Sequence, residues 1–325
     1  MKFRQFLFII PLGLAGALVA AYLVINHFPE RIPATVRDLA REPELLDYPG
    51  AERCGECHAE IYAAWKESRH FKAWTSEFYI KDSENRTKEK CLPCHAPKSQ
   101  STGNKPEPRL VHRDDGVYCV PCHFKERAMN GPYDLYAPPH PTRQNDDYRE
   151  GRFCGSCHQK TFKEWEGAGS TDTCQSCHMP RASGRLTQKF PLSLLHRKRE
   201  VADHRFLHGE LNDDAVRLEA TLGSRTVSIA LVNPRVPHLV PTADNGDPRL
   251  YLYVTLKDRT GEAVDAYKEI LAPQQDTALP PGKQIRYDYP LMDSVRQVHV
   301  SVQYRPAWTQ EKREILQQVI ERPAR

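Results

Sequence analysis

The sequence predicts an α+β protein: a helix- and loop-rich domain, then an all-β domain of the immunoglobulin-like sandwich class, with a transmembrane helix at the N-terminus. Three observations predict this class. All ten cysteines lie between residues 54 and 177, where strand patterns are scarce. After about residue 212 apolar residues alternate or cluster as they do in strands. An apolar run of about 20 residues precedes both regions.

The apolar run extends from Phe6 to Ile25 and follows Lys2 and Arg4. About 20 apolar residues are enough to cross a bilayer as a helix, and basic residues ahead of them place the N-terminus in the cytoplasm. Cleavage at Ala15-Gly16-Ala17 is the alternative, but a signal peptide has a shorter apolar region of about 7–15 residues. We expect residues 1–28 to be an uncleaved, single-pass anchor.

A linker and a domain of short helices are expected next. Residues 29–50 are rich in Pro, Glu and Arg and are typical of a linker, whereas residues 51–211 form the first domain. Helical periodicity predicts helices at Ala59–Trp74 and Gln159–Trp165. Pro- and Gly-containing loops separate these helices, as is typical of a chain that wraps around large groups.

Five Cys-x-x-Cys-His motifs use every cysteine of the chain. They consist of Cys54, Cys57 and His58; Cys91, Cys94 and His95; Cys119, Cys122 and His123; Cys154, Cys157 and His158; and Cys174, Cys177 and His178. In such a motif the two thiols add to the vinyl groups of one haem, and the histidine binds its iron. Because no cysteine is left over, zinc or disulfide frameworks are disfavoured. The motifs therefore predict five covalently bound haem c groups.

The C-terminal part predicts a β-sandwich over residues 212–308, in the size range of immunoglobulin-like domains. The expected strands are Val216–Leu222, Thr226–Val232, Leu250–Leu256, Ile285–Leu291 and Val295–Tyr304. Gly223-Ser224 marks a hairpin turn between the first two strands. Residues 309–325 are expected to be a tail with a charged helix at Gln310–Ile320.

Composition and charge exclude some classes of partner. The 46 basic and 42 acidic residues leave a formal charge of +4, so nothing indicates nucleic-acid binding. Apolar residues make up 39% of the chain, which is low for a globular protein. Five porphyrins would add apolar volume to the core, and the amino-acid composition does not count it. We expect redox proteins as partners, docking on local patches, and the membrane through the N-terminal helix.

The spacing of the motifs resembles that of the tetrahaem cytochrome c that accepts electrons from hydroxylamine oxidoreductase. The resemblance covers about residues 51–160. It rests on Cys54–His58 followed by Trp65, Ser68 and His70, then on Cys91–His95, Gly116-Val117, Cys119–His123 and Cys154–His158. The chain departs from this family by its fifth motif, its β domain and its apolar N-terminus. The resemblance implies a multihaem cytochrome that transfers electrons.

The resemblance also implies histidines that bind a haem iron from the face opposite the motif. The family uses the histidine after a Trp-x-x-Ser/Thr-x pattern to cap the haem of the third motif, which corresponds to His70. His140 matches the distal ligand of the first haem. These two ligands would interlock the haems of the first and third motifs.

For the second, fourth and fifth haems the candidate ligands are His204, His238 and His112, with His196 and His208 in reserve. The Asp203–Phe206 segment resembles the one that follows the last motif in many multihaem cytochromes. The segment from His238 to Thr242 resembles an element at the start of their β domain. His112 lies seven residues before Cys119.

A periplasmic electron carrier is the function that these patterns favour. Haem c is attached outside the bacterial cytoplasm, so the chain is expected on the periplasmic side of the inner membrane. Two other functions stay open. One is an enzyme that acts on nitrite, nitric oxide or hydroxylamine at a five-coordinate haem, because the resembling family contains a haem without a distal ligand. The other is a membrane-anchored quinol dehydrogenase, suggested by the single N-terminal helix.

Mainly bis-histidine ligation predicts low haem potentials, because an axial methionine raises them. An optical redox titration should therefore give mainly low midpoints. Mainly high midpoints would contradict this ligand set.

Overall fold

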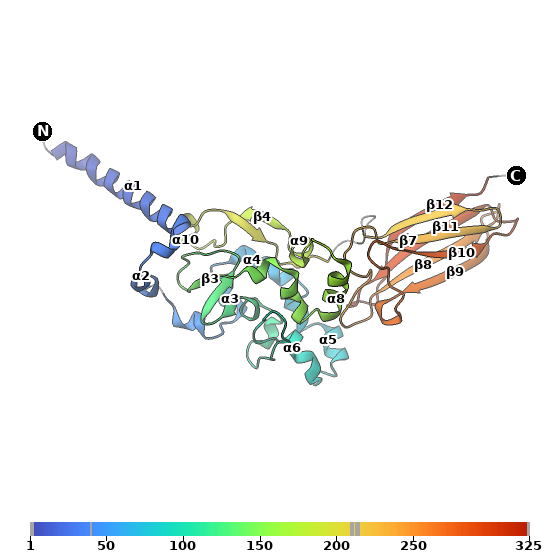
Figure 1. The fold of residues 1–325 in the computed structure, drawn as a ribbon, viewed down its shortest axis with the longest axis horizontal. Coiled ribbons are helices and arrows are strands. Elements are labelled where there is room, and N and C mark those ends of the chain that lie inside the picture. Colours follow the sequence, from blue (N-terminus) through green and yellow to red (C-terminus); the bar gives the residue numbers. More distant parts are fainter. Residues whose placement is uncertain (1–2, 40, 209–210, 212–214, 324–325) are drawn as a thin grey trace. The chain divides into compact units, whose positions relative to one another are not determined.

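The computed structural model describes residues 3–39, 41–208, 211 and 215–323. The chain divides into two compact units (Figure 1). The first unit comprises residues 1–157 and 173–207, and the second comprises residues 158–172 and 208–325. The sequence placed one boundary near residue 211, and the structure additionally groups residues 158–172 with the C-terminal unit.

The first unit is built from short helices joined by loops. Its α-helices are α1 (Phe3–His27), α2 (Ala34–Leu39), α3 (Ala51–Gly55), α4 (Ala59–Glu67), α5 (Glu77–Asp82), α6 (Leu92–His95), α7 (Cys119–His123), α9 (Cys174–His178) and α10 (Leu192–Leu195). Its 3₁₀ helices are η1 (Pro29–Arg31), η2 (Pro43–Leu46), η3 (Phe71–Ala73), η4 (Glu89–Cys91), η5 (Arg113–Asp115), η6 (Asp146–Arg149) and η7 (Gly151–Ser156).

Helix α1 contains the apolar run. Within the part of the chain that the structure describes, no helix combines the length and the apolarity that a membrane crossing requires. The last turn of α1 is fixed to the rest of the first unit by Asn26, which is buried. Its side chain donates to the Leu195 carbonyl at 2.7 Å and accepts from the Arg197 amide at 2.9 Å.

The helix expected at Ala59–Trp74 is shorter than predicted. Helix α4 ends at Glu67, and Ser68 has an extended conformation with ψ near 160°. The Ser68 hydroxyl accepts from the Phe71 amide at 3.1 Å and starts η3. A serine side chain that competes for backbone donors favours such breaks, so His70 lies between two helices and not within one.

Two small sheets complete the first unit. Strands β1 (Phe124–Lys125), β2 (Ala128–Gly131) and β3 (Thr142–Gln144) form one sheet, and β4 (Arg181–Gly184) and β5 (Arg199–Ala202) form an antiparallel pair. In that pair Arg181 is opposite Ala202. Both sheets begin within a few residues of a motif histidine, so they position the segments that lie over the motifs.

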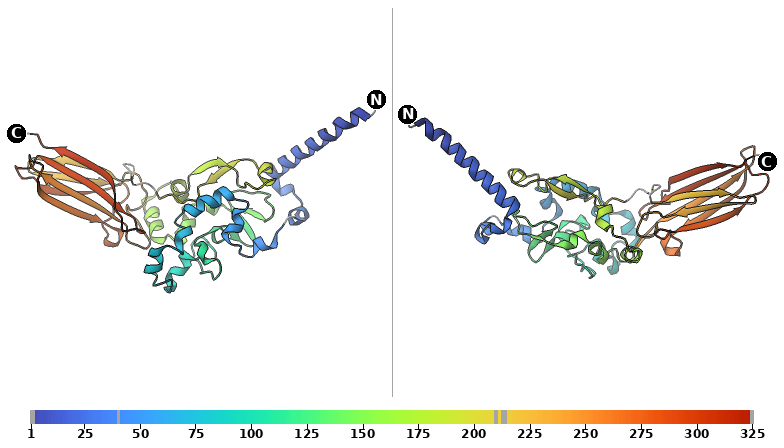
Figure 2. Two further views of the ribbon diagram at one scale, coloured as in Figure 1. Left: turned by 180° about the vertical axis from the view of Figure 1, so that it is seen from behind. Right: turned by 45° about the horizontal axis from the view of Figure 1, so that its top comes forward.

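The second unit consists of α8 (Gln159–Ala168), η8 (Pro273–Gln275) and two antiparallel sheets. One sheet has the order β10-β7-β6 and the other β12-β11-β8-β9. Figure 2 shows the strands of this unit from two further sides. The strands are β6 (Arg217–Leu222), β7 (Thr226–Val232), β8 (Arg249–Lys257), β9 (Ala263–Leu271), β10 (Gln284–Pro290), β11 (Gln297–Arg305) and β12 (Arg313–Glu321). These two sheets are the expected β region.

The two sheets share one apolar core, as in a sandwich. Ile229 and Leu231 of β7 pack in the same cluster as Leu252 of β8 and Val300 of β11, and each of the four is at most 1% exposed. Alternate residues of β8 and β11 point into this cluster and the others point away from it. The second unit therefore has a complete protein core of its own.

Two elements of this unit were not predicted correctly. The helix expected at Gln310–Ile320 is wrong, because β12 occupies this segment and pairs with β11 from Gln297↔Glu321 to Tyr304↔Arg313. Its Glu, Gln and Leu residues favour a helix, but backbone pairing at the sheet edge overrides that preference. Strand β9 was not predicted, because three of its nine residues are charged.

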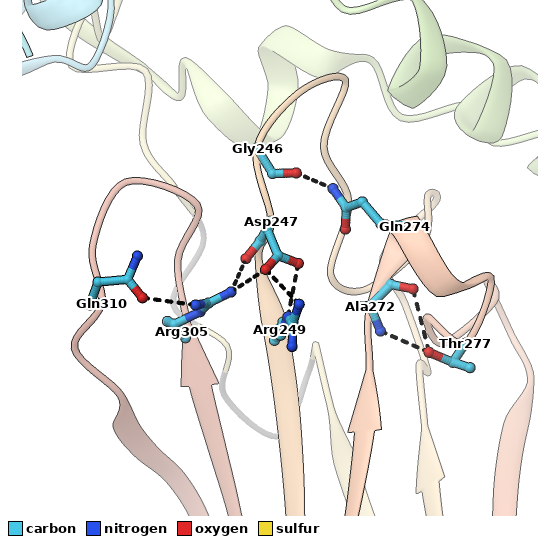
Figure 3. Close-up of polar contacts among 8 residues, drawn as sticks. All are labelled: Gly246, Asp247, Arg249, Ala272, Gln274, Thr277, Arg305 and Gln310. Atoms are coloured by element: carbon cyan, nitrogen blue, oxygen red, sulfur yellow. Dashed lines mark hydrogen bonds and ion pairs between the residues drawn. The ribbon is translucent and has the colours of Figure 1, made fainter. Parts of the chain in front are cut away.

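A network of polar contacts holds one end of the second unit together (Figure 3). The Asp247 carboxylate pairs with Arg249 at 2.8 Å and with Arg305 at 2.6 Å. Gln274 of η8 donates to the Gly246 carbonyl. Because these contacts join the loop before β8 to β11 and to η8, they hold the 242–247 loop against the sandwich.

The Asp247 ion pairs should make stability depend on pH. Hydrogen bonds from Arg249 and Arg305 lower the pKa of Asp247 below its usual value, so the stabilisation is present above about pH 4 and is lost as the pH falls through the lowered pKa. Asp247→Asn should cost about 1 kcal/mol of unfolding free energy at pH 7, since the pair is partly exposed.

Thermal unfolding at pH 7 and at pH 3 would measure this cost. The difference between Asp247→Asn and the unmodified protein should shrink at pH 3. Asp276→Asn, at an exposed position near η8, is the control. An equal difference at both pH values would contradict the assignment.

Candidate functional site

Four of the five motifs fold as a single helical turn that places both sulfurs and the imidazole on one side. The turns of the second, third and fifth motifs are α6, α7 and α9. In the first motif the His58 amide donates to the Cys54 carbonyl at 3.0 Å, which closes the same turn. Residues i, i+3 and i+4 share one face of a helix. The fourth motif begins in η7.

In each of these four motifs the histidine Nδ1 atom meets a backbone carbonyl oxygen. The carbonyls are those of Leu186 for His58, Ala73 for His95 (2.6 Å), Asn130 for His123 (2.7 Å) and Leu207 for His178 (2.6 Å). A carbonyl only accepts, so Nδ1 carries the proton and Nε2 keeps its lone pair. This is the state in which an imidazole binds a metal, with its other nitrogen held by the protein.

Two motif histidines face a second imidazole. The ring centroids of His58 and His140 are 6.3 Å apart at 32°, and those of His123 and His204 are 6.2 Å apart at 33°. Two imidazoles that bind one metal from opposite sides, each through a bond of about 2 Å, have ring centres roughly 6 Å apart. Both pairs therefore have the spacing of an iron with two axial histidines.

The buried imidazoles of these pairs are neutral. Burial lowers the pKa of His123 and that of His140 to about 4, and it also lowers the pKa of His204. A protonated imidazole has no lone pair to give. At neutral pH these side chains are in the form that coordinates iron.

Cysteines of different motifs lie next to one another within the first unit. Contact with Cys54 and burial raise the pKa of the Cys119 thiol. Contacts with Cys94 and with Cys174 likewise raise the pKa of Cys157 and of Cys154. These contacts join the first motif to the third, and the fourth motif to the second and fifth.

The third and fourth motifs are also close. The proximity of Cys122 is among the causes that raise the pKa of both Cys154 and Cys157. None of the ten cysteines forms a disulfide. The five motifs therefore form one connected series, with the cysteines of the fourth motif at its centre.

The imidazole that faces the third motif is one that the sequence did not place there. The sequence placed His70 there, but the ring that faces His123 is that of His204. The reason is the β4–β5 pair, which returns the chain from the fifth motif to Ala202 and fixes His204 through a bond between its Nδ1 and the Ala202 carbonyl at 2.8 Å. The His70 ring packs edge-on against Phe206, with centroids 4.1 Å apart, and its role as an iron ligand stays a prediction.

His112 and His238 lie outside the two observed pairs. His112 is exposed, has a positive φ of 50° and lies 6.5 Å from the ring of Tyr118. His238 lies in the second unit, in the loop before β8, and its Nδ1 contacts the Leu239 carbonyl at 2.9 Å. Their role as iron ligands stays a prediction.

Two tyrosines stack on motif histidines, a feature that the sequence did not indicate. Tyr79 is parallel to His95 with centroids 3.9 Å apart, and Tyr148 is parallel to His123 at 5.2 Å. The Tyr148 hydroxyl also donates to the Cys122 carbonyl at 2.5 Å. These rings fix the orientation of the imidazoles. Both tyrosines are distant in sequence from the motifs they contact, so no local pattern identifies them.

Arg109 is a second feature that sequence reasoning missed. It is 3% exposed, and its guanidinium donates to the carbonyls of Pro97 at 2.9 Å, Val111 at 3.0 Å, His112 at 2.8 Å and Gly116. Pro97 follows the second motif and Gly116 precedes the third. This single side chain therefore holds together the loop that connects the two motifs.

Gly116 is required by the same loop. Its φ is +60°, and a Cβ atom there would lie 2.4 Å from the His70 carbonyl oxygen and 2.6 Å from that of Phe71. The His70 carbonyl also accepts from the Val117 amide at 2.9 Å. Only glycine permits this close approach, which joins the segment around His70 to the start of the third motif.

The residues of these motifs fit haem c. Each motif offers two cysteines that form no disulfide, and four of the five histidines have Nδ1 at a carbonyl oxygen, which leaves the lone pair on Nε2. The fifth, His158, has its Nδ1 3.5 Å from the Asp244 carboxylate. Neutral imidazole and thiolate sulfur are the protein groups that haem c chemistry uses.

Comparisons with known proteins also indicate that the chain binds haem. The family model "Cytochrome c554 and c-prime" matches residues 53–124, which contain the first three motifs. The crystal structure of a penta-heme cytochrome c552 from Thermochromatium tepidum aligns with a TM-score of 0.63 and 19% identity, covering 85% of this chain and 99% of that one. At this identity the likeness shows the fold, which is that of a multihaem cytochrome.

A second solved structure, Northeast Structural Genomics Consortium target SoR45, is 12% identical and covers 34% of this chain and 89% of its own. Its TM-score of 0.20 is too low to indicate a common fold. No curated protein matches the sequence. Together the family model and the penta-heme structure support a multihaem c-type cytochrome with covalently bound haem that transfers electrons.

Arg109→Met should destabilise the first unit by about 3 kcal/mol, because it leaves buried carbonyls without a charged donor. Urea unfolding followed by circular dichroism in the Soret band would measure this, since that signal reports on the haem surroundings. Arg149→Met is the matched control, because Arg149 is exposed and donates to the Pro132 carbonyl. A change no larger than that of the control would contradict the role of Arg109.

Proposed function

We propose that the chain is a pentahaem c-type cytochrome, tethered to the periplasmic face of the bacterial inner membrane, that passes electrons between redox partner proteins. The observation that carries this proposal is the pairing of His58 with His140 and of His123 with His204. An iron with two histidine ligands has no open position for a substrate, so it exchanges electrons without binding one.

The arrangement of the motifs supports transfer within the chain. Contacts between cysteines connect the first motif to the third and the fourth motif to the second and fifth. Bound haem would supply the one-electron chemistry at each motif. The chain's own residues fix the positions of neighbouring sites, hold each proximal imidazole by its Nδ1 atom and keep the imidazoles neutral.

The proposed ligand set follows the structure where it differs from the sequence. We assign His140 to the first haem and His204 to the third. His70, His112 and His238 remain candidates for the other three haems. All three can be tested by single substitutions.

The proposed location rests on the sequence. Lys2 and Arg4 precede the apolar run, which supports a cytoplasmic N-terminus and a periplasmic remainder. Covalent haem attachment outside the cytoplasm supports the same side of the membrane. The donor and acceptor are expected to be proteins, because no charge excess favours another class of partner.

Electron paramagnetic resonance of the oxidised haem-loaded protein, with and without nitric oxide, tests the carrier function. A carrier should show low-spin signals and no nitric oxide adduct. A high-spin haem that binds nitric oxide would contradict this and favour an enzyme acting on a nitrogen compound.

Substitution of each facing histidine tests the ligand assignment. His140→Ala and His204→Ala should each convert one haem to the high-spin form, because one axial ligand is lost. His299→Ala is the control, since His299 lies in β11 and contacts Gln297 at 3.1 Å. Unchanged low-spin spectra in both variants would overturn the assignment.

A further inference from the structure

The histidine of the fourth motif is held by a different kind of acceptor from the others. Its Nδ1 atom lies 3.5 Å from the Oδ2 atom of Asp244, whereas Nδ1 of the other four meets a carbonyl oxygen. A carboxylate carries a full negative charge and is a stronger acceptor than a carbonyl. Both residues belong to the second unit.

The Asp244 carboxylate is fixed in place by the first turn of α8. The Lys160 amide donates to Oδ1 at 2.5 Å, and the Thr161 hydroxyl donates to Oδ2 at 3.2 Å. Because these donors lie at the N-terminus of a ten-residue helix, the helix dipole favours the ionised carboxylate. Asp244 is therefore held as an anion beside His158.

The loop that carries Asp244 is itself anchored on both sides. Before Asp244, the Thr242 hydroxyl donates to Glu164 of α8 at 2.7 Å. After it, Gly246 and Asp247 are held by Gln274 and by the two arginines shown in Figure 3. These contacts leave the carboxylate little freedom to turn away from the imidazole.

We propose that Asp244 is a positioning residue that lowers the reduction potential of the haem bound by His158. A carboxylate that accepts from Nδ1 makes the imidazole a more basic ligand. Its charge also favours the oxidised iron, which is the more positive state. The inference rests on the proposed function, since it requires a haem at the fourth motif.

Redox titration of the haem-loaded Asp244→Asn variant tests this proposal. The midpoint potential of one haem should rise by about 59 mV, which is a tenfold change in the equilibrium constant of a one-electron reduction. The midpoint potentials of the other haems should not change. Asp258→Asn removes the same charge from an exposed turn at the other end of β8, about 30 Å along the strand. It should leave every component unchanged.

Two further variants separate tuning from a structural role. Asp244→Glu keeps the negative charge, so the midpoint potential of this haem should lie closer to that of the unmodified protein than to that of Asp244→Asn. Thr161→Val removes a donor to Oδ2 while keeping the side-chain shape, so the oxygen becomes a better acceptor for His158. This variant should lower the midpoint potential of the same haem, which is the opposite of the change expected for Asp244→Asn. It therefore tests the proposal even if Asp244→Asn does not incorporate haem.

The outcomes also distinguish this proposal from the proposed function. The pyridine haemochrome assay gives the number of haems per chain in every variant. Unmodified protein without haem would overturn the proposed function. Haem-loaded variants whose midpoints all match the unmodified protein, or in which Asp244→Glu shifts as far as Asp244→Asn, would overturn only the role of Asp244.

Discussion

The hydrogen bond between Nδ1 and a backbone carbonyl at four motif histidines is the constraint on which the first unit depends. A motif turn can place an imidazole beneath a haem, but it cannot decide which nitrogen carries the proton. That decision is made by an oxygen from another segment. For His58 it comes from a residue 128 positions away and for His178 from one 29 positions away. The loops between motifs must therefore close over the motifs, and their paths are fixed by these carbonyls.

Apolar packing is divided unequally between the two units, and this explains the low apolar content of the sequence. The cluster around Trp65, Tyr118 and Val120 and the one around Trp74 are small. The cluster of the second unit draws on both of its sheets. The first unit therefore relies on porphyrin to complete its core, whereas the second is stabilised by its own side chains. We expect haem attachment to contribute more to the folding of the first unit than to that of the second.

The motifs and most strands could be predicted from the sequence, because both are local patterns. Cys-x-x-Cys-His is contiguous, and the apolar alternation of Thr226–Val232 matches β7 residue for residue. The two edge strands of the four-stranded sheet, β9 and β12, were missed. β12 has the composition of a helix, and its conformation is set by pairing with β11. Arg109 closes the loop between two motifs, and Tyr148 bonds to a residue 26 positions away. Neither contact follows from a sequence pattern.

The segment from the fifth motif to Leu207 shows why the histidine that faces the third motif was not assigned from the sequence. Leu186, just after β4, supplies the carbonyl for His58 of the first motif. His204, just after β5, faces His123 of the third motif, and Leu207 supplies the carbonyl for His178. One hairpin thus serves three motifs, so the fifth motif is part of the scaffold as well as a haem site.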